Sequence, residues 1–244
     1  MPMAKSATYN TVNSMGITVY HTPAPHASKL ASAAFGRTVA GFGAAGATAA
    51  VGYLFIPGAL LFWLPVAIAL IGVGMFYKDQ WGKARVGVQS EVKVAKTLAK
   101  SNCAQVLINS AMLGAGGDAD HVLLGPVAVV VETKTGFGKI RVKDGRVYSG
   151  NRIVGKNEVE QVSRQATKLS RILGGIPVAK IICVADGKGK PIQTGGVWVC
   201  NADDISAVVK MSAAVIENER LSSCVNKVLE VHQSVNKVLN KKKS

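Results

Sequence analysis

The stretch GGDADHVLLGPVAVVVETKTGFGKI, residues 116–140, decides the fold of this chain. It contains two runs of Val and Leu, which are typical of buried strands. Gly125-Pro126 separates the runs and suits a tight turn. The two strands are therefore predicted to fold back on each other within one sheet.

Charged side chains stand at the ends of these two strands. Residues two apart in a strand point to the same face, so Glu132 and Lys134 share one face, and so do Asp118 and Asp120. The fold-back would bring the acids together at one edge of the sheet. Carboxylates this close repel each other, and burial adds to the cost of ionising them.

A divalent cation would resolve that repulsion. Mg²⁺ prefers oxygen ligands and keeps several waters, and a neighbouring lysine can neutralise charge on a phosphate. The stretch therefore predicts a metal site with a lysine beside it. An alternative is a solvated ion cluster at a strand edge, because Glu and Lys two apart are common on exposed strands.

The surrounding sequence predicts an α/β domain. Apolar spacing favours helices over about residues 87–100, which carry Glu91 next to the apolar stripe, and over about 158–173. Strands are expected at AQVLINSAML, at KIRVKDGRVYSG with its Asp144-Gly145 turn, at VAKIICVAD and at GVWVCN. The fold class is a mixed sheet flanked by helices, assigned to residues 78–202.

Residues 38–77 contain no Asp, Glu, Lys or Arg. This length is about twice the ~20 residues that one membrane-spanning helix needs. Pro57 and Gly58 interrupt the segment, so it is predicted to form a transmembrane hairpin with spans at 38–56 and 58–77. A buried helical hairpin inside a soluble protein is the alternative.

The hairpin prediction carries a location with it. Basic residues flank the segment on both sides, so both termini and the α/β domain are expected in the cytoplasm, with the chain a multi-pass protein of the cell inner membrane. Residues 1–37 are rich in Pro, Ser and Thr and are expected to be a flexible cytoplasmic leader.

The last segment, residues 203–244, is predicted to be a helical, coiled-coil-like basic tail. Leu221, Val225, Val228, His232 and Val235 are spaced as in a heptad seam. Self-association through this seam and docking of the seam on the α/β domain both remain open. The basic end of the tail could also contact acidic lipid.

The net charge of +15 predicts an anionic partner, either nucleic acid or the acidic face of a membrane. From Lys78 onward, 26 basic residues stand against 14 acidic ones, which favours contact with phosphate. The four cysteines form no CxxC pair, which argues against a zinc site and against a disulfide framework.

Three segments carry a family resemblance: GVQSEVKVAKTL, GGDADHVLLGPVAVVVETKTGFGKI and KNEVEQVSRQATKL. Together they resemble the nuclease-related domain, NERD, a branch of the PD-(D/E)xK nuclease superfamily. The similarity covers roughly residues 86–173, and GDADHV followed by VETK is its specific part.

The resemblance implies roles for individual residues. Asp120 and Glu132 would be metal ligands, and Lys134 would be the catalytic lysine. The remaining matches are Glu91 as the acid of the first helix and a metal ligand, Gln161 as a catalytic glutamine, Asp118 as a supporting metal ligand and His121 in a supporting role.

Three positions depart from the family pattern. Ser90 replaces the usual glycine before the helix acid, Glu158 replaces a proline, and Thr135 stands where Asn or His is common. None of them removes an expected ligand, but residues around the motif shape the substrate groove.

The resemblance, taken together with the predicted transmembrane hairpin, thus implies a membrane-anchored nuclease that uses Mg²⁺ or Mn²⁺ to hydrolyse phosphodiester bonds in DNA. The alternative is a noncatalytic membrane adaptor that binds DNA or a protein partner through the same fold. The sequence does not separate DNA from RNA as the substrate.

Overall fold

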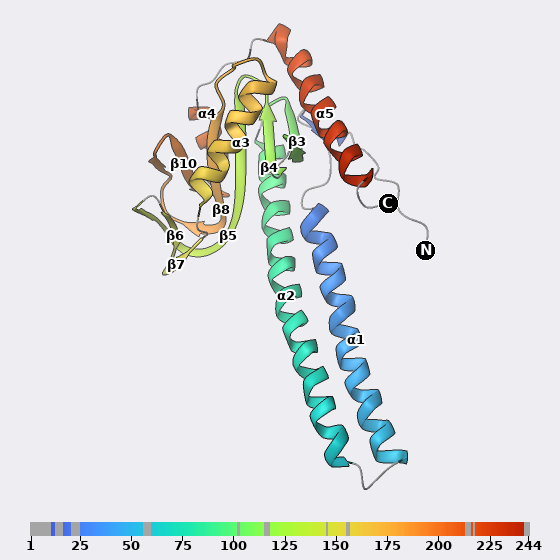
Figure 1. Ribbon diagram of the computed structural model, residues 1–244. Helices are drawn as coiled ribbons and strands as arrows, with labels where there is room; N and C mark the ends of the chain where they lie inside the picture. Colours follow the sequence, from blue (N-terminus) through green and yellow to red (C-terminus); the bar gives the residue numbers. More distant parts are fainter. Residues whose placement is uncertain are drawn as a thin grey trace. The chain divides into compact units, whose positions relative to one another are not determined.

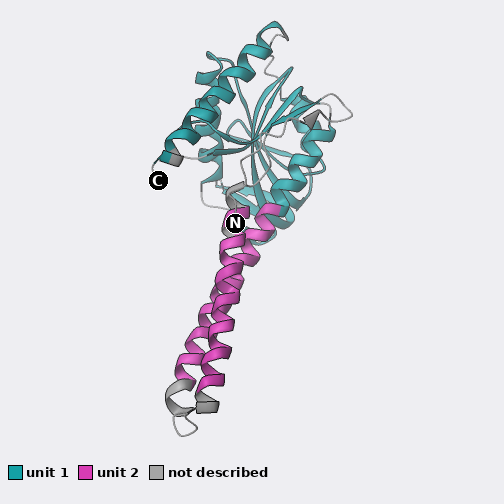
Figure 2. Cartoon of the chain, turned by 90° about the vertical axis from the view of Figure 1, so that its right-hand side faces the viewer, with its two compact units in different colours: residues 1–24, 89–244 teal, residues 25–88 magenta. Residues whose placement is uncertain are grey.

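The computed structural model describes residues 11–12, 17–20, 25–55, 60–101, 103–114, 118–144, 146–154, 157–212, 216 and 218–241. The chain divides into two compact units (Figure 2). Unit 1 comprises residues 1–24 and 89–244, and unit 2 comprises residues 25–88.

Unit 2 is built from two helices. α1 spans Pro25–Phe55, and the first part of α2, which spans Leu60–Lys100, follows it (Figure 1). The predicted turn at Pro57-Gly58 lies outside the described residues. Both helices are longer than expected. Residues 87–100 are helical as predicted, but they do not form a separate helix, because α2 runs from Leu60 to Lys100. The ion pair between Lys83 and Asp79, one helical turn apart, supports this continuity.

The two helices of unit 2 approach each other through small residues. A Cβ atom added to Gly41 would lie 3.0 Å from the Cα of Gly74, so a larger residue would have to push the two backbones slightly apart. Ala45 and Ala67 are also buried. Large apolar side chains such as Ile68 point outward instead, and the exposed large hydrophobic side chains of the described chain are concentrated in this unit.

No helix within the described ranges is both long and apolar enough to cross a membrane. The two predicted helices are present and contact each other at Gly41 and Gly74, whereas their transmembrane character is not confirmed.

Unit 1 is a mixed α/β sandwich around one sheet. The sheet follows the order β1-β2-β3-β4-β5-β8-β10-β9. Off this path, β6 pairs with β5, and β7 pairs with β6. β5 pairs antiparallel with β4 and parallel with β8, which places it at the centre. The strands are β1 Thr11–Val12, β2 Thr18–Tyr20, β3 Val106–Met112, β4 Asp118–Leu124, β5 Ala128–Lys143, β6 Arg146–Ser149, β7 Arg152–Ile153, β8 Ala179–Lys188, β9 Ile192–Thr194 and β10 Val197–Asn201.

Helices cover both faces of this sheet. α3 (Glu158–Ile172) and α5 (Asn218–Lys241) pack on one face, where Val162, Leu169 and Val228 join the core. The end of α2 and the short helix α4 (Ile205–Met211) cover the other face. The α/β class and most predicted strands are confirmed. β3 and the first part of β5 are buried without alternation, as in strands covered on both faces.

The first residues of the chain were predicted to be a flexible leader. Part of that segment instead extends the sheet, because β2 pairs in parallel with β3 and Ile17 is buried in the core. α1 also begins at Pro25, inside the predicted leader.

The predicted heptad seam of the tail packs on unit 1. Leu221, Val225 and Val228 belong to the same core cluster as the sheet, and the backbone N–H of Met112 in β3 donates to Nδ1 of His232 at 3.0 Å. Docking on the domain is therefore the alternative that holds. The prediction of self-association is not supported, since the apolar positions that a coiled coil would use are already buried against the sheet.

Candidate active site

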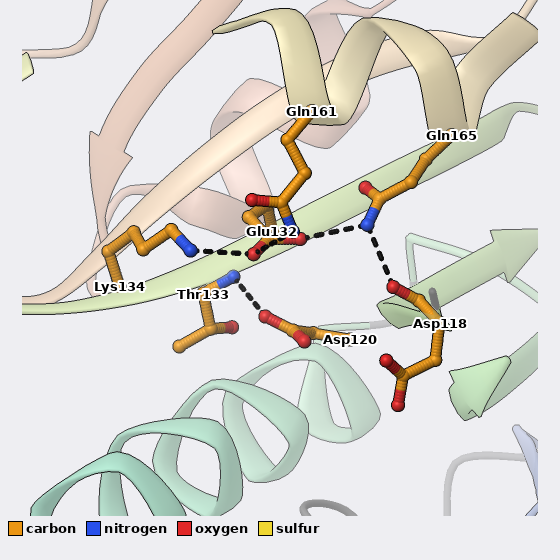
Figure 3. Close-up of polar contacts among 7 residues, drawn as sticks. All are labelled: Asp118, Asp120, Glu132, Thr133, Lys134, Gln161 and Gln165. Carbon is orange, nitrogen blue, oxygen red and sulfur yellow. Dashed lines mark hydrogen bonds and ion pairs between the residues drawn. The ribbon is translucent and has the colours of Figure 1, made fainter. Parts of the chain in front are cut away.

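Glu132 and Lys134 form an ion pair on one face of β5. Lys134 Nζ donates to Glu132 Oε1 at 2.8 Å, as the two-residue spacing predicts (Figure 3). Glu132 is only 3% exposed, and the strand that carries it is buried on both faces up to Thr133. The carboxylate is therefore held on a rigid support.

Two glutamines of α3 complete the hydrogen bonding of Glu132. Gln161 Nε2 donates to Glu132 Oε1 at 2.7 Å, and Gln165 Nε2 donates to Glu132 Oε2 at 3.0 Å (Figure 3). Residues four apart lie on the same face of a helix, so both amides reach the strand. The sequence pattern identifies Gln161 but not Gln165, although the position of Gln165 one turn further along the amphipathic helix is a usable signal.

Asp120 lies beside this pair and is held by the backbone of β5. The N–H of Thr133 donates to Asp120 Oδ2 at 2.7 Å. Figure 3 shows Asp120 on the opposite side of β5 from Gln161, with the strand between them. The acids of β4 and β5 thus meet at one end of the sheet, as predicted, but they approach it from its two sides.

The environment of Asp120 opposes its ionisation. Burial raises the pKa of Asp120 well above its ordinary value, and the neighbouring charges of Glu132 and Glu91 raise it further. The Thr133 N–H and Lys134 act in the other direction without cancelling these effects. A buried carboxyl in this position favours either a proton or a nearby cation.

Lys134 is stabilised as a cation. Burial would lower the pKa of Lys134, but the charge and hydrogen bond of Glu132 outweigh that effect and raise it. Asp120 and Glu158 contribute in the same direction. Lys134 is thus a fixed positive charge at neutral pH, which suits electrostatic stabilisation better than proton abstraction.

His121, predicted to play a supporting role, is a buried part of the sheet. It is fully enclosed, and its Nδ1 lies 2.8 Å from Oδ1 of Asn109 on β3. Burial lowers the pKa of His121 to about 3, so the ring is neutral. Its Nε2 has no hydrogen-bond partner among the described groups.

The wider set of predicted metal ligands is not assembled. Gln165 Nε2 donates to the backbone carbonyl oxygen of Asp118 at 2.8 Å. Figure 3 shows the Asp118 carboxylate turned away from that amide. Glu91 acts on Asp120 through its charge from α2. Within the described ranges, no group of three or more His, Cys, Asp or Glu side chains is arranged to hold a metal ion.

The chemistry of the site nevertheless fits a divalent cation at Asp120 and Glu132. Carboxylate oxygens are the ligands that Mg²⁺ and Mn²⁺ prefer. Burial raises the pKa of Asp120, the charges of Glu132 and Glu91 raise it further, and the positive charge of Lys134 does not offset them. A cation beside both acids would supply that charge.

Two departures from the family pattern contact each other. The hydroxyl oxygens of Ser90 on α2 and Thr135 on β5 lie 3.2 Å apart in a hydrogen bond. The third departure, Glu158, is buried at the start of α3 and adds to the charge that keeps Lys134 protonated. None of these three residues takes the place of a residue to which the family pattern assigns a role.

The comparisons with known proteins agree with this geometry. A family model described as the nuclease-related domain, NERD, matches residues 86–194. No curated protein and no solved structure matches the chain. The matched range includes Glu132, the side chains that donate hydrogen bonds to it, and Glu91 on α2. Residues 86–194 are therefore similar to the nuclease-related domain, which is consistent with the PD-(D/E)xK nuclease superfamily.

Proposed function

We propose that this chain hydrolyses phosphodiester bonds in DNA with the help of Mg²⁺ or Mn²⁺. The observation that supports this most is the Glu132–Lys134 ion pair, held by two glutamines of α3 beside the buried Asp120. A structural ion pair on an exposed strand would not need two amides, one of them the buried Gln165, to orient its carboxylate.

Each residue has a role in the proposed reaction. Lys134 places a positive charge where a phosphate would develop negative charge in the transition state. Asp120 and Glu132 would hold the cation, which would polarise the phosphoryl group when bound. Gln161 fixes the orientation of Glu132, and the buried part of β5 that carries Glu132 keeps bulk water away from the strand side of the site.

A cleavage assay on the full chain in detergent tests this proposal. The substrate is a labelled DNA oligonucleotide, with Mg²⁺, with Mn²⁺ or with a chelator. Cleavage should require the metal and should fall by about 10²-fold or more in Lys134→Met, since removing one stabilising charge or donor costs about that much. Lys96→Met, at an exposed position of α2, is the matched control. Equal rates in wild type and Lys134→Met would contradict the proposal.

The noncatalytic adaptor remains a second candidate because of one observation. Both oxygens of Glu132 already accept hydrogen bonds from the chain itself, from Lys134 and Gln161 at Oε1 and from Gln165 at Oε2. An adaptor would bind DNA in the presence of a chelator and would show no cleavage with either metal.

We further propose that unit 2 attaches the chain to the cell inner membrane, with unit 1 in the cytoplasm. Its helices place glycine and alanine against each other and large apolar side chains such as Phe42 and Met75 outside. Such an arrangement suits an apolar surrounding better than water. Arg37 and Lys78 bound the uncharged segment.

Fractionation of cells that express the full chain tests this attachment. The chain should stay in the membrane pellet after an alkaline carbonate wash, and Ile68→Lys with Met75→Lys should release it. Release of the wild type by the wash would contradict the proposal. A wild-type chain that is soluble but dimeric would indicate that a second copy covers the apolar surface.

A further inference from the structure

β5 continues well beyond the catalytic pair. A register shift between Lys134 and Phe137 against β8 bends the strand just after the site. Gly136 is required at the bend, because a Cβ there would lie 2.7 Å from the Cβ of Ser149 and 2.8 Å from a methyl of Val184. The strand then runs on to Lys143 and pairs with β6. We call β5 from Phe137 onward, with β6 and β7, the ribbon.

The sequence GFGK, at the start of the ribbon, suggests a connection between strands. It lies instead within the continuous strand β5. The predicted turn at Asp144-Gly145 is confirmed to the extent that Lys143 pairs with Arg146 and Asp144 has φ of 50°. The ribbon is therefore a two-stranded extension that begins just after the catalytic lysine, with the short β7 added to its side.

The ribbon is strongly basic. Between Phe137 and Val154 it carries one acid, Asp144 in the turn, against five basic side chains, all of them exposed: Lys139, Arg141, Lys143, Arg146 and Arg152. Lys139, Arg141 and Lys143 alternate along β5, so they share a face and follow each other at about 7 Å intervals.

One of these side chains is already fixed in place. Arg141 Nη2 donates to the backbone carbonyl of Gly150 at 2.5 Å and to Oδ1 of Asn151 at 3.2 Å. The guanidinium has further donors that these two bonds do not use. A row of exposed cations with so little acid suits a polyanion.

An exposed aromatic side chain stands between the catalytic lysine and this basic row. Phe137 is 68% exposed, which is unusual for a phenylalanine, and lies about 10 Å along the strand from Lys134. It lines a cavity of about 520 Å³ together with Thr135, Ser149, Asn151, Arg152 and Ile153. Ser149 is 4% exposed, and its hydroxyl has no partner among the described groups.

A single exposed phenylalanine needs no explanation, but its surroundings here are specific. Aromatic side chains beside a basic track are the arrangement by which proteins bind single strands, since an unstacked base packs on the ring while phosphates meet the cations. A protein partner would not require a row of exposed positive charges along the same strands. The charge therefore selects nucleic acid as the occupant.

We propose that the ribbon binds single-stranded DNA, with a base stacked on Phe137 at the cavity and the following phosphates on Lys139, Lys143 and Arg146. This inference rests on the proposed nuclease function, because it makes the ribbon the track that leads a strand to Lys134. It also predicts a preference for single-stranded or frayed ends over blunt duplex, since paired bases cannot stack on the ring.

Fluorescence anisotropy of the full chain in detergent tests the ribbon, with a labelled oligothymidine and a chelator present so that no cleavage occurs. Phe137→Ala should weaken binding about tenfold, and Phe137→Trp should restore it. Met211→Ala, at an exposed apolar position on α4, should have no effect. A Phe137→Ala chain that binds as tightly as wild type would overturn the proposal.

A second oligonucleotide separates stacking from charge. An oligomer with abasic sites keeps the phosphates and removes the bases, so wild type should bind it about as weakly as Phe137→Ala binds the intact strand. Phe137→Ala should not distinguish the two oligomers. If wild type also fails to distinguish them, the stacking role is wrong.

The basic row is tested through salt dependence. Lys143→Ala with Arg146→Ala should reduce the slope of log affinity against log salt by about 0.7 for each phosphate that the variant no longer neutralises. Lys227→Ala with Arg220→Ala on α5 is the matched control for charge and should leave the slope unchanged. Equal slopes in the two double variants would exclude the ribbon as the track.

These outcomes are separable from those of the cleavage assay. Metal-dependent cleavage with binding that ignores Phe137 and the basic row overturns the ribbon alone. Binding that depends on Phe137 without any cleavage overturns the nuclease proposal and leaves the ribbon as the binding surface of an adaptor. A wild-type chain that neither binds nor cleaves DNA overturns both.

Discussion

Gln165 Nε2 lies 3.0 Å from Glu132 Oε2, and the same nitrogen lies 2.8 Å from the backbone carbonyl oxygen of Asp118. One amide on α3 therefore ties the helix to both β4 and β5. Gln165 is buried, so its orientation is fixed by packing. Residues that orient a ligand in this way usually matter almost as much as the ligand itself.

Gln165→Leu should lower the rate of cleavage about 10- to 100-fold, because it leaves Glu132 Oε2 without its donor and loosens the carboxylate. The metal concentration for half-maximal cleavage should rise in parallel. Gln193→Leu, at an exposed position of β9, serves as control. An unchanged metal dependence in Gln165→Leu would show that the amide only fills space.

Asp120→Asn should abolish cleavage and stabilise the fold at neutral and alkaline pH. The pKa of Asp120 is raised in the folded chain, so protonation favours folding, and this contribution is lost as pH rises through the folded pKa. The asparagine cannot ionise and avoids that loss.

Thermal unfolding at a series of pH values measures this effect. The melting temperature of Asp120→Asn should exceed that of wild type at about pH 8, and the difference should shrink as the pH falls toward the ordinary pKa of an aspartate. Added Mg²⁺ should raise the melting temperature of wild type more than that of the variant. A difference that does not depend on pH would mean that Asp120 is not buried as an ionisable group.

His121 should make the fold sensitive to acid. Its pKa is lowered to about 3, so the folded chain resists protonation that the unfolded chain accepts below about 6.5. Stability is then lost as pH falls through this window, by about 3–5 kcal/mol at its lower end. Urea unfolding between about pH 7 and pH 4 should show a steep loss in wild type and a shallower one in His121→Gln. Parallel losses would assign the acid sensitivity to other groups.

The sequence predicts the centre of the fold well for a physical reason. The strands around Glu132 alternate or run apolar as buried strands do, and Gly125-Pro126 ends one of them, so local rules agree with the tertiary structure. The ion pair of Glu132 and Lys134 follows from the same two-residue period. The NERD resemblance locates the domain by its motifs, and the family model matches an overlapping range.

Other features depend on contacts that no local pattern encodes. Ser110 has φ of 49° on β3, next to the end of β4 that carries Asp120, and there the regular pleat no longer predicts which face a side chain takes. The short strand β2 has too few apolar residues to stand out, and it forms because β3 offers an edge. The heptad of α5 indicates an apolar stripe without indicating what covers it.

The docked tail should contribute to stability through His232. His232→Leu removes the acceptor for the Met112 N–H at the end of β3, and an unsatisfied buried amide costs about 1–3 kcal/mol. Hydrogen exchange should accelerate in α5 and in β3. Gln233→Leu, at an exposed neighbouring position, should leave both elements protected. Faster exchange in α5 alone would show that the tail docks without support from this bond.

Binding of Mn²⁺ to the full chain, followed by electron paramagnetic resonance, tests most directly whether Asp120 and Glu132 work as one cation site beside Lys134. We expect one bound ion per chain in wild type. Binding should be lost in Asp120→Asn and in Glu132→Gln, and it should persist in Lys134→Met, which removes a competing positive charge. A wild-type chain that binds no ion, or an Asp120→Asn chain that binds as tightly as wild type, would contradict the account.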